Sequence, residues 1–256
     1  MIHPTAIIDP AADLAADVEV GAYTLIGAGV HIASGCVIGP HVVLRGPTRI
    51  GPQTRIFQFA SVGEDPQDKK FAGEPTSLVI GARNVIREFA TVHRGTVQDK
   101  GETRIGDDSL LMAYTHVAHD CVIGNNVIMA NAASLGGHVE VQDWAILGGF
   151  SIVHQFCQIG AHSFSAMGSV IAKDVPPYVT VGGHPAVPRG INTEGLRRRQ
   201  FTPEAIAALR RAYRLLYLGN LKLTDALAQI RELAGTHPEL DLLADFVADS
   251  SRSIVR

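Results

Sequence analysis

The chain has 256 residues, of which 46% are hydrophobic, 18% are charged and only 6% are aromatic, and its formal net charge is -3. A chain with so little net charge has no general attraction for nucleic acid. No run of about 18 apolar residues is present, so no membrane span is predicted. The N-terminus lacks the basic and apolar regions of a signal peptide, and we therefore expect a cytoplasmic protein.

A six-residue period runs through the first two thirds of the chain. The period matches neither the 3.6 residues of an α-helix nor the alternation of a simple strand, so it indicates a repeat fold. Ser165 is the one exception before Ile171. The repeated positions are aliphatic, in three runs: Ile8, Leu14, Val20, Ile26, Ile32, Ile38, Leu44, Ile50, Ile56, Val62; Ile80, Ile86, Val92; and Ile105, Leu111, Val117, Ile123, Met129, Leu135, Val141, Leu147, Val153, Ile159.

Each hexad predicts one short strand and one tight corner. The aliphatic residue would fill the interior, and the small or β-branched residue four positions later would fit the corner. The glycine that often comes directly after the aliphatic residue, as at Gly51 and Gly124, would tolerate the turn geometry. Three hexads would close a triangular coil of about 18 residues, and successive coils would stack about 4.8 Å apart.

This pattern resembles the left-handed parallel β-helix of the hexapeptide-repeat proteins. The left hand is implied by the resemblance and not by the period. Proteins of this architecture commonly associate around a three-fold axis, so the resemblance also implies a homotrimer. We expect a mainly β protein with a β-helix over residues 1–190.

Two polar stretches interrupt the hexads, near residues 63–79 and 96–104, and the second shifts the phase of the repeat by one. Both are predicted to be loops pushed out of the coil wall. Insertions of this kind often carry the binding function of a repeat protein, although a tolerated surface insertion is the simpler alternative.

The pattern becomes helical after residue 190, and a small α-helical domain is predicted over residues 191–256. Thr202 and Pro203 provide an N-cap followed by proline at the first helical position, and Gly219 could end that helix. Further helices are expected from Thr224 to Ala234 and over roughly 239–250. This domain would cap the open end of the β-helix or pack on its side.

Three cysteines, Cys36, Cys121 and Cys157, fall on the small corner position of a hexad. Their placement favours small buried residues over catalytic or metal-binding ones. An odd number of cysteines without an evident pairing fits a reducing compartment.

Five of the eleven histidines lie between residues 93 and 154, and the coil length aligns them. Residues 18 apart occupy the same angular position on adjacent coils, so His119 aligns with Gly137 and Asp120 with His138. Positions 118, 136 and 154 also align, so His154 lies on that column, and His93 joins it if the second loop extrudes about seven residues. The predicted patch along one edge comprises His93, His116, His119, Asp120, His138 and His154.

Such a patch is suited to general base catalysis. Neutral imidazole is the natural base near pH 7, and a carboxylate such as Asp120 can fix its tautomer. A zinc site is the alternative. It is weakened because His116 and His119 stand three apart on a strand-like stretch and would point to opposite sides. We expect no metal.

Seven segments carry a more specific resemblance: 58–64, 72–76, 92–97, 116–121, 137–139, 153–157 and 192–199. Together they closely resemble the UDP-N-acetylglucosamine O-acyltransferases that begin lipid A synthesis. The likeness covers essentially the whole chain. It implies transfer of a 3-hydroxyacyl chain from acyl carrier protein to the 3-hydroxyl of UDP-N-acetylglucosamine, with no cofactor beyond these two substrates.

The resemblance also implies roles for individual residues. His119 would be the general base, Asp120 would orient it, and the backbone N–H of Gly137 would stabilise the oxyanion. Substrate contacts are implied in three groups. Asp68 and Lys70 would hold the glucosamine and donor region; His116, His138 and, in the same patch, His93 would bind the sugar or its phosphates; and His154, Gln155, Asn192, Glu194, Arg198 and Arg199 would bind the nucleotide.

Met167 matches the family position that ends the acyl groove. Methionine there fills the volume of several carbons, whereas glycine would leave room for a longer tail. Each buried methylene contributes about 0.8 kcal/mol, so a medium chain of about ten carbons is predicted. The alternative is that Met167 only packs in the core.

Other functions remain open at this point. An acetyltransferase using acetyl-CoA and an N-acyltransferase acting later in the pathway share the fold class, and a structural scaffold would need no histidine patch. The residues do not distinguish a 3-hydroxyl acceptor from a 3-amino acceptor.

Overall fold

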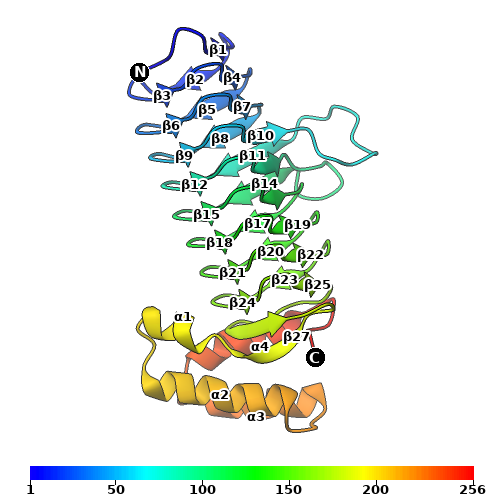
Figure 1. Ribbon diagram of the computed structural model, residues 1–256. Coiled ribbons are helices and arrows are strands. Elements are labelled where there is room, and N and C mark those ends of the chain that lie inside the picture. Colours follow the sequence, from blue (N-terminus) through cyan, green and yellow to red (C-terminus); the bar gives the residue numbers. More distant parts are fainter.

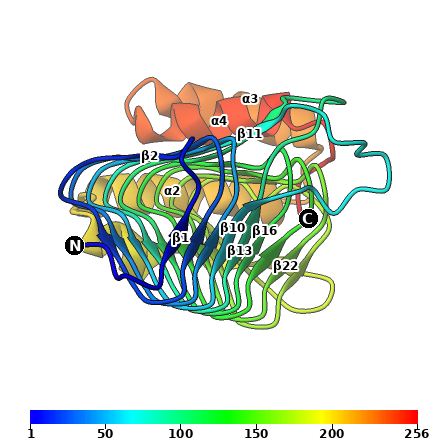
Figure 2. The ribbon, with the colours of Figure 1, turned by 90° about the horizontal axis from the view of Figure 1, so that it is seen from above.

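A computed structural model describes residues 1–256 and shows a long triangular β-helix followed by four helices (Figure 1). Each coil contributes one short strand to each of three sheets, which contain nine, eight and ten strands. All neighbouring strands are parallel except the last pair of the ten-stranded sheet. Seen along its axis, the chain winds round a flat-sided tube (Figure 2).

The strand bounds follow the hexads. The nine-stranded sheet contains β1 (Ile7–Ile8), β4 (Leu25–Ile26), β7 (Val43–Leu44), β10 (Ser61–Glu64), β13 (Thr91–His93), β16 (His116–Val117), β19 (Ser134–Leu135), β22 (Ile152–Val153) and β25 (Val170–Ile171). The eight-stranded sheet contains β2 (Asp13–Leu14), β5 (Val30–Ile32), β8 (Thr48–Ile50), β11 (Ser77–Ile80), β14 (Glu102–Ile105), β17 (Val122–Ile123), β20 (Glu140–Val141) and β23 (Gln158–Ile159). The ten-stranded sheet contains β3 (Glu19–Val20), β6 (Val37–Ile38), β9 (Arg55–Ile56), β12 (Val85–Ile86), β15 (Leu110–Leu111), β18 (Ile128–Met129), β21 (Ile146–Leu147), β24 (Phe164–Ser165), β26 (Val179–Gly182) and β27 (Val187–Ile191).

The register confirms the 18-residue coil. His116 pairs with Ser134, and Ser134 with Ile152, each 18 residues further along the chain. The repeated aliphatic positions fill the tube, and they form most of a core of 40 buried residues. Ser165, the exception to the period, is also buried. Its hydroxyl lies 2.7 Å from that of Ser151, so a polar side chain inside the tube keeps a hydrogen bond.

The corner glycines have a different role from the one predicted. The left-handed backbone conformation falls on the third residue after the aliphatic one, and that residue is usually not glycine, as at Asp120 (φ 59°) and His138 (φ 64°). Gly51, directly after the aliphatic position, has no positive φ. A Cβ there would lie 2.5 Å from the carbonyl carbon of Gly81 on the next coil. These glycines are needed because adjacent coils approach closely, not because the turn is left-handed.

The three corners of the tube differ in chemistry, and we name them by their residues. The histidine edge joins the nine- and eight-stranded sheets and carries His119, Asp120 and His138. The aromatic edge joins the ten- and nine-stranded sheets. Its rings stack with centroids 4.9–5.3 Å apart, in the order Tyr23, His41, Phe59, Phe89 and Tyr114.

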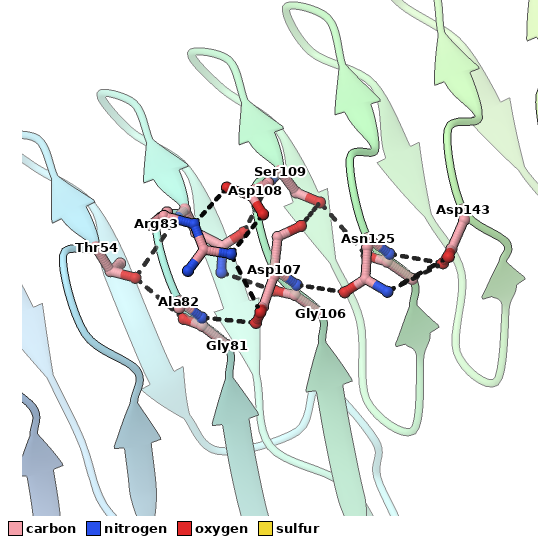
Figure 3. Close-up of polar contacts among 12 residues, drawn as sticks. Thr54, Gly81, Ala82, Arg83, Gly106, Asp107, Asp108, Ser109, Asn125 and Asp143 are labelled. Carbon is pink, nitrogen blue, oxygen red and sulfur yellow. Dashed lines mark hydrogen bonds and ion pairs between the residues drawn. The ribbon is translucent and has the colours of Figure 1, made fainter. Parts of the chain in front are cut away.

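The carboxylate edge joins the eight- and ten-stranded sheets and is shown in Figure 3. Side-chain oxygens of Asp107, Asn125 and Asp143 accept hydrogen bonds of 2.8 Å from backbone N–H groups on the preceding coil. These contacts satisfy corner donors that the sheets leave unpaired.

Both insertions leave the coil at the histidine edge, and Figure 1 shows them projecting on the same side of the tube. Residues 65–76 connect β10 to β11, and residues 94–101 connect β13 to β14. Both are slightly shorter than predicted because strand pairing continues to Glu64 and resumes at Ser77 and Glu102. Thr91 pairs with His116, an offset of 25 residues in place of 18, so the second loop extrudes seven residues as expected.

The helical region contains α1 (Thr193–Arg198), α2 (Pro203–Tyr217), α3 (Leu223–Ala234) and α4 (Glu239–Asp249). Thr202 caps α2 by accepting a hydrogen bond from the Ala205 N–H at 3.1 Å. The helices enclose a second core of 16 buried residues at the end of the tube. The C-terminal segment is tied back to the tube by a bridge between Asp174 and Ile254. None of the helices combines the length and apolar character needed to cross a membrane.

Candidate active site

The histidine edge brings His119, Asp120, Gly137 and His138 together on two adjacent coils. The coils are joined here by the His138 N–H, which donates to the His119 carbonyl at 3.0 Å. His119 thus lies over Gly137 and Asp120 over His138, in the alignment predicted from the period. Gln155 follows on the next coil, and His154 is beside it. Both are exposed.

His119 and Asp120 form a hydrogen-bonded pair. His119 Nδ1 donates to Asp120 Oδ2 at 2.8 Å, and the His119 side chain is 15% exposed. Because the carboxylate accepts from Nδ1–H, the second ring nitrogen, Nε2, is left with its lone pair available. That nitrogen can take a proton from a bound substrate, and the carboxylate then stabilises the imidazolium.

Asp120 is completely buried, and its carboxylate remains charged because Thr96 donates hydrogen bonds to it. The Thr96 N–H donates to both carboxylate oxygens at 3.0 Å, and its hydroxyl donates to Oδ2 at 2.6 Å. Burial alone would raise the pKa of Asp120, but the hydrogen bonds from Thr96 and His119 outweigh it and hold that pKa below its ordinary value. Asp120 is therefore an anion at neutral pH.

The backbone of Gly137 lies directly against the His119 ring. A Cβ on residue 137 would stand 2.6 Å from His119 Cε1 and 2.8 Å from Nε2, so only glycine leaves the ring in place. The Gly137 carbonyl accepts from Phe156, whereas its N–H donates to no group of the chain. A free backbone N–H beside a basic nitrogen is the geometry of an oxyanion donor.

His138 is held on three sides. Its ring stacks on Phe156 with centroids 4.3 Å apart and meets His119 edge to face at 4.9 Å. Its Nδ1 lies 2.7 Å from Asp99 Oδ2 on the second loop. Phe156 and Asp99 were not predicted. Phe156 could have been found, since it is 18 residues after His138.

A groove of about 490 Å³ opens beside these residues, between the two loops and the coil wall. It contains three of the predicted substrate-binding residues, Asp68, Lys70 and His138. A Lys100–Glu140 ion pair of 2.7 Å crosses one side of it. The other lining residues are Thr96, Gln98, Asp99, Phe156, Gln158 and Ser251.

His93 and His116 lie deeper, at the base of the first loop. His93 is 5% exposed, and its Nδ1 donates to the Asp65 carbonyl at 2.6 Å. Burial lowers the pKa of His93. Burial, with the neighbouring His93 and His119, also lowers the pKa of His116 to about 4. Both rings are neutral near pH 7, and His93 holds the loop against the coil.

The remaining nucleotide-binding candidates lie on another edge of the same chain. Asn192 caps α1 and donates to the His162 carbonyl at 2.9 Å, and Arg199 donates to the Trp144 carbonyl at 2.9 Å. Arg198 pairs with Glu194 at 3.1 Å, both exposed. Trp144 and His162 are corner residues of the carboxylate edge, so a single chain does not bring this group to His119.

Met167 lies on the third edge, at the corner between β24 and β25. It is 81% exposed, so the alternative that it merely packs in the core is wrong. It is separated from His119 by the width of the nine-stranded sheet. The catalytic candidates, the nucleotide candidates from Asn192 to Arg199, and Met167 thus occupy three different edges.

The histidine edge also contains the atoms that a metal ion could use. Ligand atoms of His119, Asp120 and His138 lie within 4.8 Å of one another. This trio differs from the His116–His119 pair considered from the sequence. Its atoms already form hydrogen bonds with Thr96, Asp99 and each other, so a metal would have to displace those contacts.

The cysteines are free and buried, as predicted. Burial raises the pKa of Cys121 to about 12 and that of Cys157 to about 11, and it also raises that of Cys36. The thiols therefore stay protonated and unreactive near neutral pH.

A parallel β-helix with a histidine–aspartate pair on one edge defines a transferase of the hexapeptide class. Residues 102–137 match the family model described as bacterial transferase hexapeptide (six repeats), and residues 174–255 match that of UDP N-acetylglucosamine O-acyltransferase, domain 2. An acyl-[acyl-carrier-protein]--UDP-N-acetylglucosamine O-acyltransferase from Stutzerimonas stutzeri (strain A1501) is 56% identical over 256 residues, covering all of this chain and 99% of the relative. The protein of that name from Thiobacillus denitrificans is 55% identical, with the same coverage.

Solved structures agree over the full length. LpxA from Acinetobacter baumannii superposes with a TM-score of 0.97 at 49% identity, covering all of this chain and 99% of that one. LpxA from Bacteroides fragilis 9343, a UDP-N-acetylglucosamine acyltransferase, gives 0.98 at 38% identity with complete coverage of both chains. These structures are left-handed β-helices, and a helix of the opposite hand could not superpose so closely, so the predicted hand is confirmed. The chain belongs to the UDP-N-acetylglucosamine O-acyltransferase family and is an acyltransferase.

Proposed function

We propose that this enzyme transfers a 3-hydroxyacyl chain of about ten carbons from acyl carrier protein to the 3-hydroxyl of UDP-N-acetylglucosamine. This is the first step of lipid A biosynthesis, and it would take place in the cytoplasm without a further cofactor. The relatives are named for acyl carrier protein and this sugar nucleotide. The observation that carries the proposal is the His119–Asp120 pair, which lies against the free N–H of Gly137 and next to His138, a residue that lines the groove.

The chemistry follows from these groups. His119 Nε2 removes the proton of the sugar 3-hydroxyl as its oxygen attacks the thioester carbonyl carbon. The carbonyl oxygen becomes an oxyanion and accepts a hydrogen bond from the Gly137 N–H, a contact of the kind that contributes about 10²–10³-fold to the rate. When the C–S bond breaks, the leaving thiolate takes the proton from the His119 imidazolium. No acyl-enzyme forms.

The groove supports the assignment of the sugar and donor contacts. Asp68 and Lys70 on the first loop face the same space as His138, so the glucosamine would lie between loop and coil. His93 and His116 would complete the site from its base, and His154 and Gln155 would extend it toward the nucleotide.

The separation of the three edges supports a homotrimer with sites between subunits. Asn192, Glu194, Arg198 and Arg199 can reach a nucleotide in the groove only from a neighbouring chain. Exposed apolar side chains on and beside the aromatic edge, including Phe150 and Ile152, would be covered in such an assembly. The aromatic and carboxylate edges border the same ten-stranded sheet, so one neighbour could supply both Met167 and Arg199.

The reaction is tested by acyl transfer from 3-hydroxydecanoyl-acyl carrier protein to UDP-N-acetylglucosamine. His119→Ala should lower kcat by about 10²–10⁴-fold, the usual contribution of a general base. His31→Ala is the matched control and should retain native turnover, because this exposed histidine lies on β5, four strands away from β17 in the eight-stranded sheet. Native turnover in His119→Ala would contradict the assignment of the base. If the native enzyme turned over no donor of any chain length, with either the 3-hydroxyl or the 3-amino acceptor, that result would contradict the reaction.

Chain length is tested with donors of different lengths. The native enzyme should prefer about ten carbons, and Met167→Gly should shift the preference toward about fourteen, since several buried methylenes contribute about 0.8 kcal/mol each. Competition between the two donors in one reaction measures this ratio directly. A native preference for fourteen carbons, or no shift in Met167→Gly, would contradict the role of Met167.

A further inference from the structure

The second loop is fastened to the coils beyond it by consecutive residues near its end. Asp99 Oδ2 lies 2.7 Å from His138 Nδ1, and the Lys100 ammonium lies 2.7 Å from Glu140. Thr96, nearer the start of the loop, holds Asp120. The loop is therefore joined both to the coil that carries His119 and to the following coil, which carries His138.

We infer that Asp99 is a positioning residue for the acyl transfer, acting through His138. A carboxylate that accepts from Nδ1–H fixes one tautomer of the imidazole. Stacking on Phe156 and the edge contact with His119 then fix the plane of the ring. The remaining nitrogen, Nε2, is the only one that His138 can present to a substrate in the groove. This inference rests on the proposed use of the groove for substrate.

The surroundings of His138 single out Asp99 as its direct partner. Asp120 Oδ2 is 3.9 Å from His138 Nδ1 and already accepts from Thr96 and His119. In this pair the His138 side chain is 14% exposed and the Asp99 side chain 38%, so the burial of the ring sets the pair apart from an ordinary surface ion pair. The adjacent Lys100–Glu140 pair is more exposed, at 36% and 45%, and touches no histidine. Fastening of the loop and positioning of the ring can therefore be separated by substitution.

The tautomer of His138 provides a readout that does not depend on activity. Nitrogen-15 NMR of the full-length enzyme should show His138 as the Nδ1–H tautomer, and Asp99→Ala should convert it to a mixture. Lys100→Gln weakens the loop without touching the ring and should leave the tautomer unchanged. An unchanged tautomer in Asp99→Ala would overturn the inference, even if the enzyme proved to act on other substrates.

Kinetics then test whether Asp99 acts through His138. Asp99→Ala should lower kcat/KM by roughly ten- to a hundred-fold, the effect of one charge-assisted hydrogen bond, while Asp99→Glu should restore part of it. Arg104→Gln, which removes an exposed pair with Glu102 just after the loop, is the control for unchanged activity. In a His138→Ala background Asp99→Ala should cause no further loss. Equal losses in both backgrounds would overturn the inference in favour of a purely structural role.

Discussion

His116 shows how strongly burial can change the pKa of one histidine in a cluster of several. Its ring shares a 2.8 Å hydrogen bond with the Thr91 hydroxyl and lies edge to face with His93. Burial and the neighbouring histidines disfavour a positive charge there, and they lower the pKa of His116 from 6.5 to about 4. His119, nearby, has instead a buried anion as its partner. The same residue type thus has a neutral partner, the Thr91 hydroxyl, at one position and a buried carboxylate at the other.

The lowered pKa of His116 predicts that the fold loses stability in acid. Between pH 6.5 and about 4, the unfolded chain binds a proton at His116 that the folded chain does not, so stability falls as the pH is lowered through this window. His162, whose pKa burial and Arg199 also lower to about 4, adds an effect of the same sign. His116→Gln should lose less stability than the native chain between pH 7 and pH 5. Denaturant midpoints measure this, and identical losses in both proteins would contradict it.

At the level of single residues, the repeat predicted the alignment of the coil residues, and the family resemblance supplied Asp68 and Lys70 on the first loop. Neither predicted the contacts that Thr96 and Asp99 make from the second loop. The 18-residue spacing placed His119 against Gly137 and Asp120 beside His138. Asp99 could not be predicted in this way because a loop tip has no fixed register with the coils. The lowered pKa of Asp120 could not be predicted either. It depends on hydrogen bonds from Thr96, and the position of Thr96 depends on the path of the second loop.

At the scale of strands and corners, close approach between coils limits the fold as much as apolar burial does. Gly27 and Gly51 both follow an aliphatic position, but their surroundings differ. A Cβ at residue 27 would stand 3.4 Å from the nearest atom, whereas one at residue 51 would stand 2.5 Å from backbone that cannot move independently.

This pair predicts a difference in stability. Gly51→Ala should lower the free energy of unfolding by about 1–3 kcal/mol, the usual range for overpacking. Gly27→Ala should change it by about 1 kcal/mol or less, since it adds a methyl group at ordinary contact distance. Denaturant unfolding of both variants tests this, and equal effects would show that approach between coils is not the reason for glycine.

The hexad period predicted nearly every strand because each repeat buries one residue and turns one corner. It could not reveal why glycine is present, since a small residue suits both a left-handed turn and a close contact. Strand β27, which runs antiparallel, lies beyond the repeat and had no periodic signal. The helix cap at Thr202 carried its own local signal, and α2 begins where that cap predicts.

For the whole molecule, the central feature is the distribution of site residues over three edges of one tube. The histidine edge holds the proposed base, His119, and the groove, the carboxylate edge holds Arg199, and the aromatic edge carries Met167. A tube with flat sides keeps these edges apart within one chain. Association of chains is what would bring them into one site, and that is the central claim of the proposed mechanism.

Mixed trimers test this claim most directly. His119→Ala removes the base from one edge, and the double variant Arg198→Ala, Arg199→Ala removes nucleotide contacts from another. Each should be nearly inactive alone at low UDP-N-acetylglucosamine. When the two are co-expressed with different tags and purified for both, each trimer should contain one intact site in three, about one third of native activity. Activity no greater than the average of the separate variants would show that each chain holds a complete site, and would contradict the account.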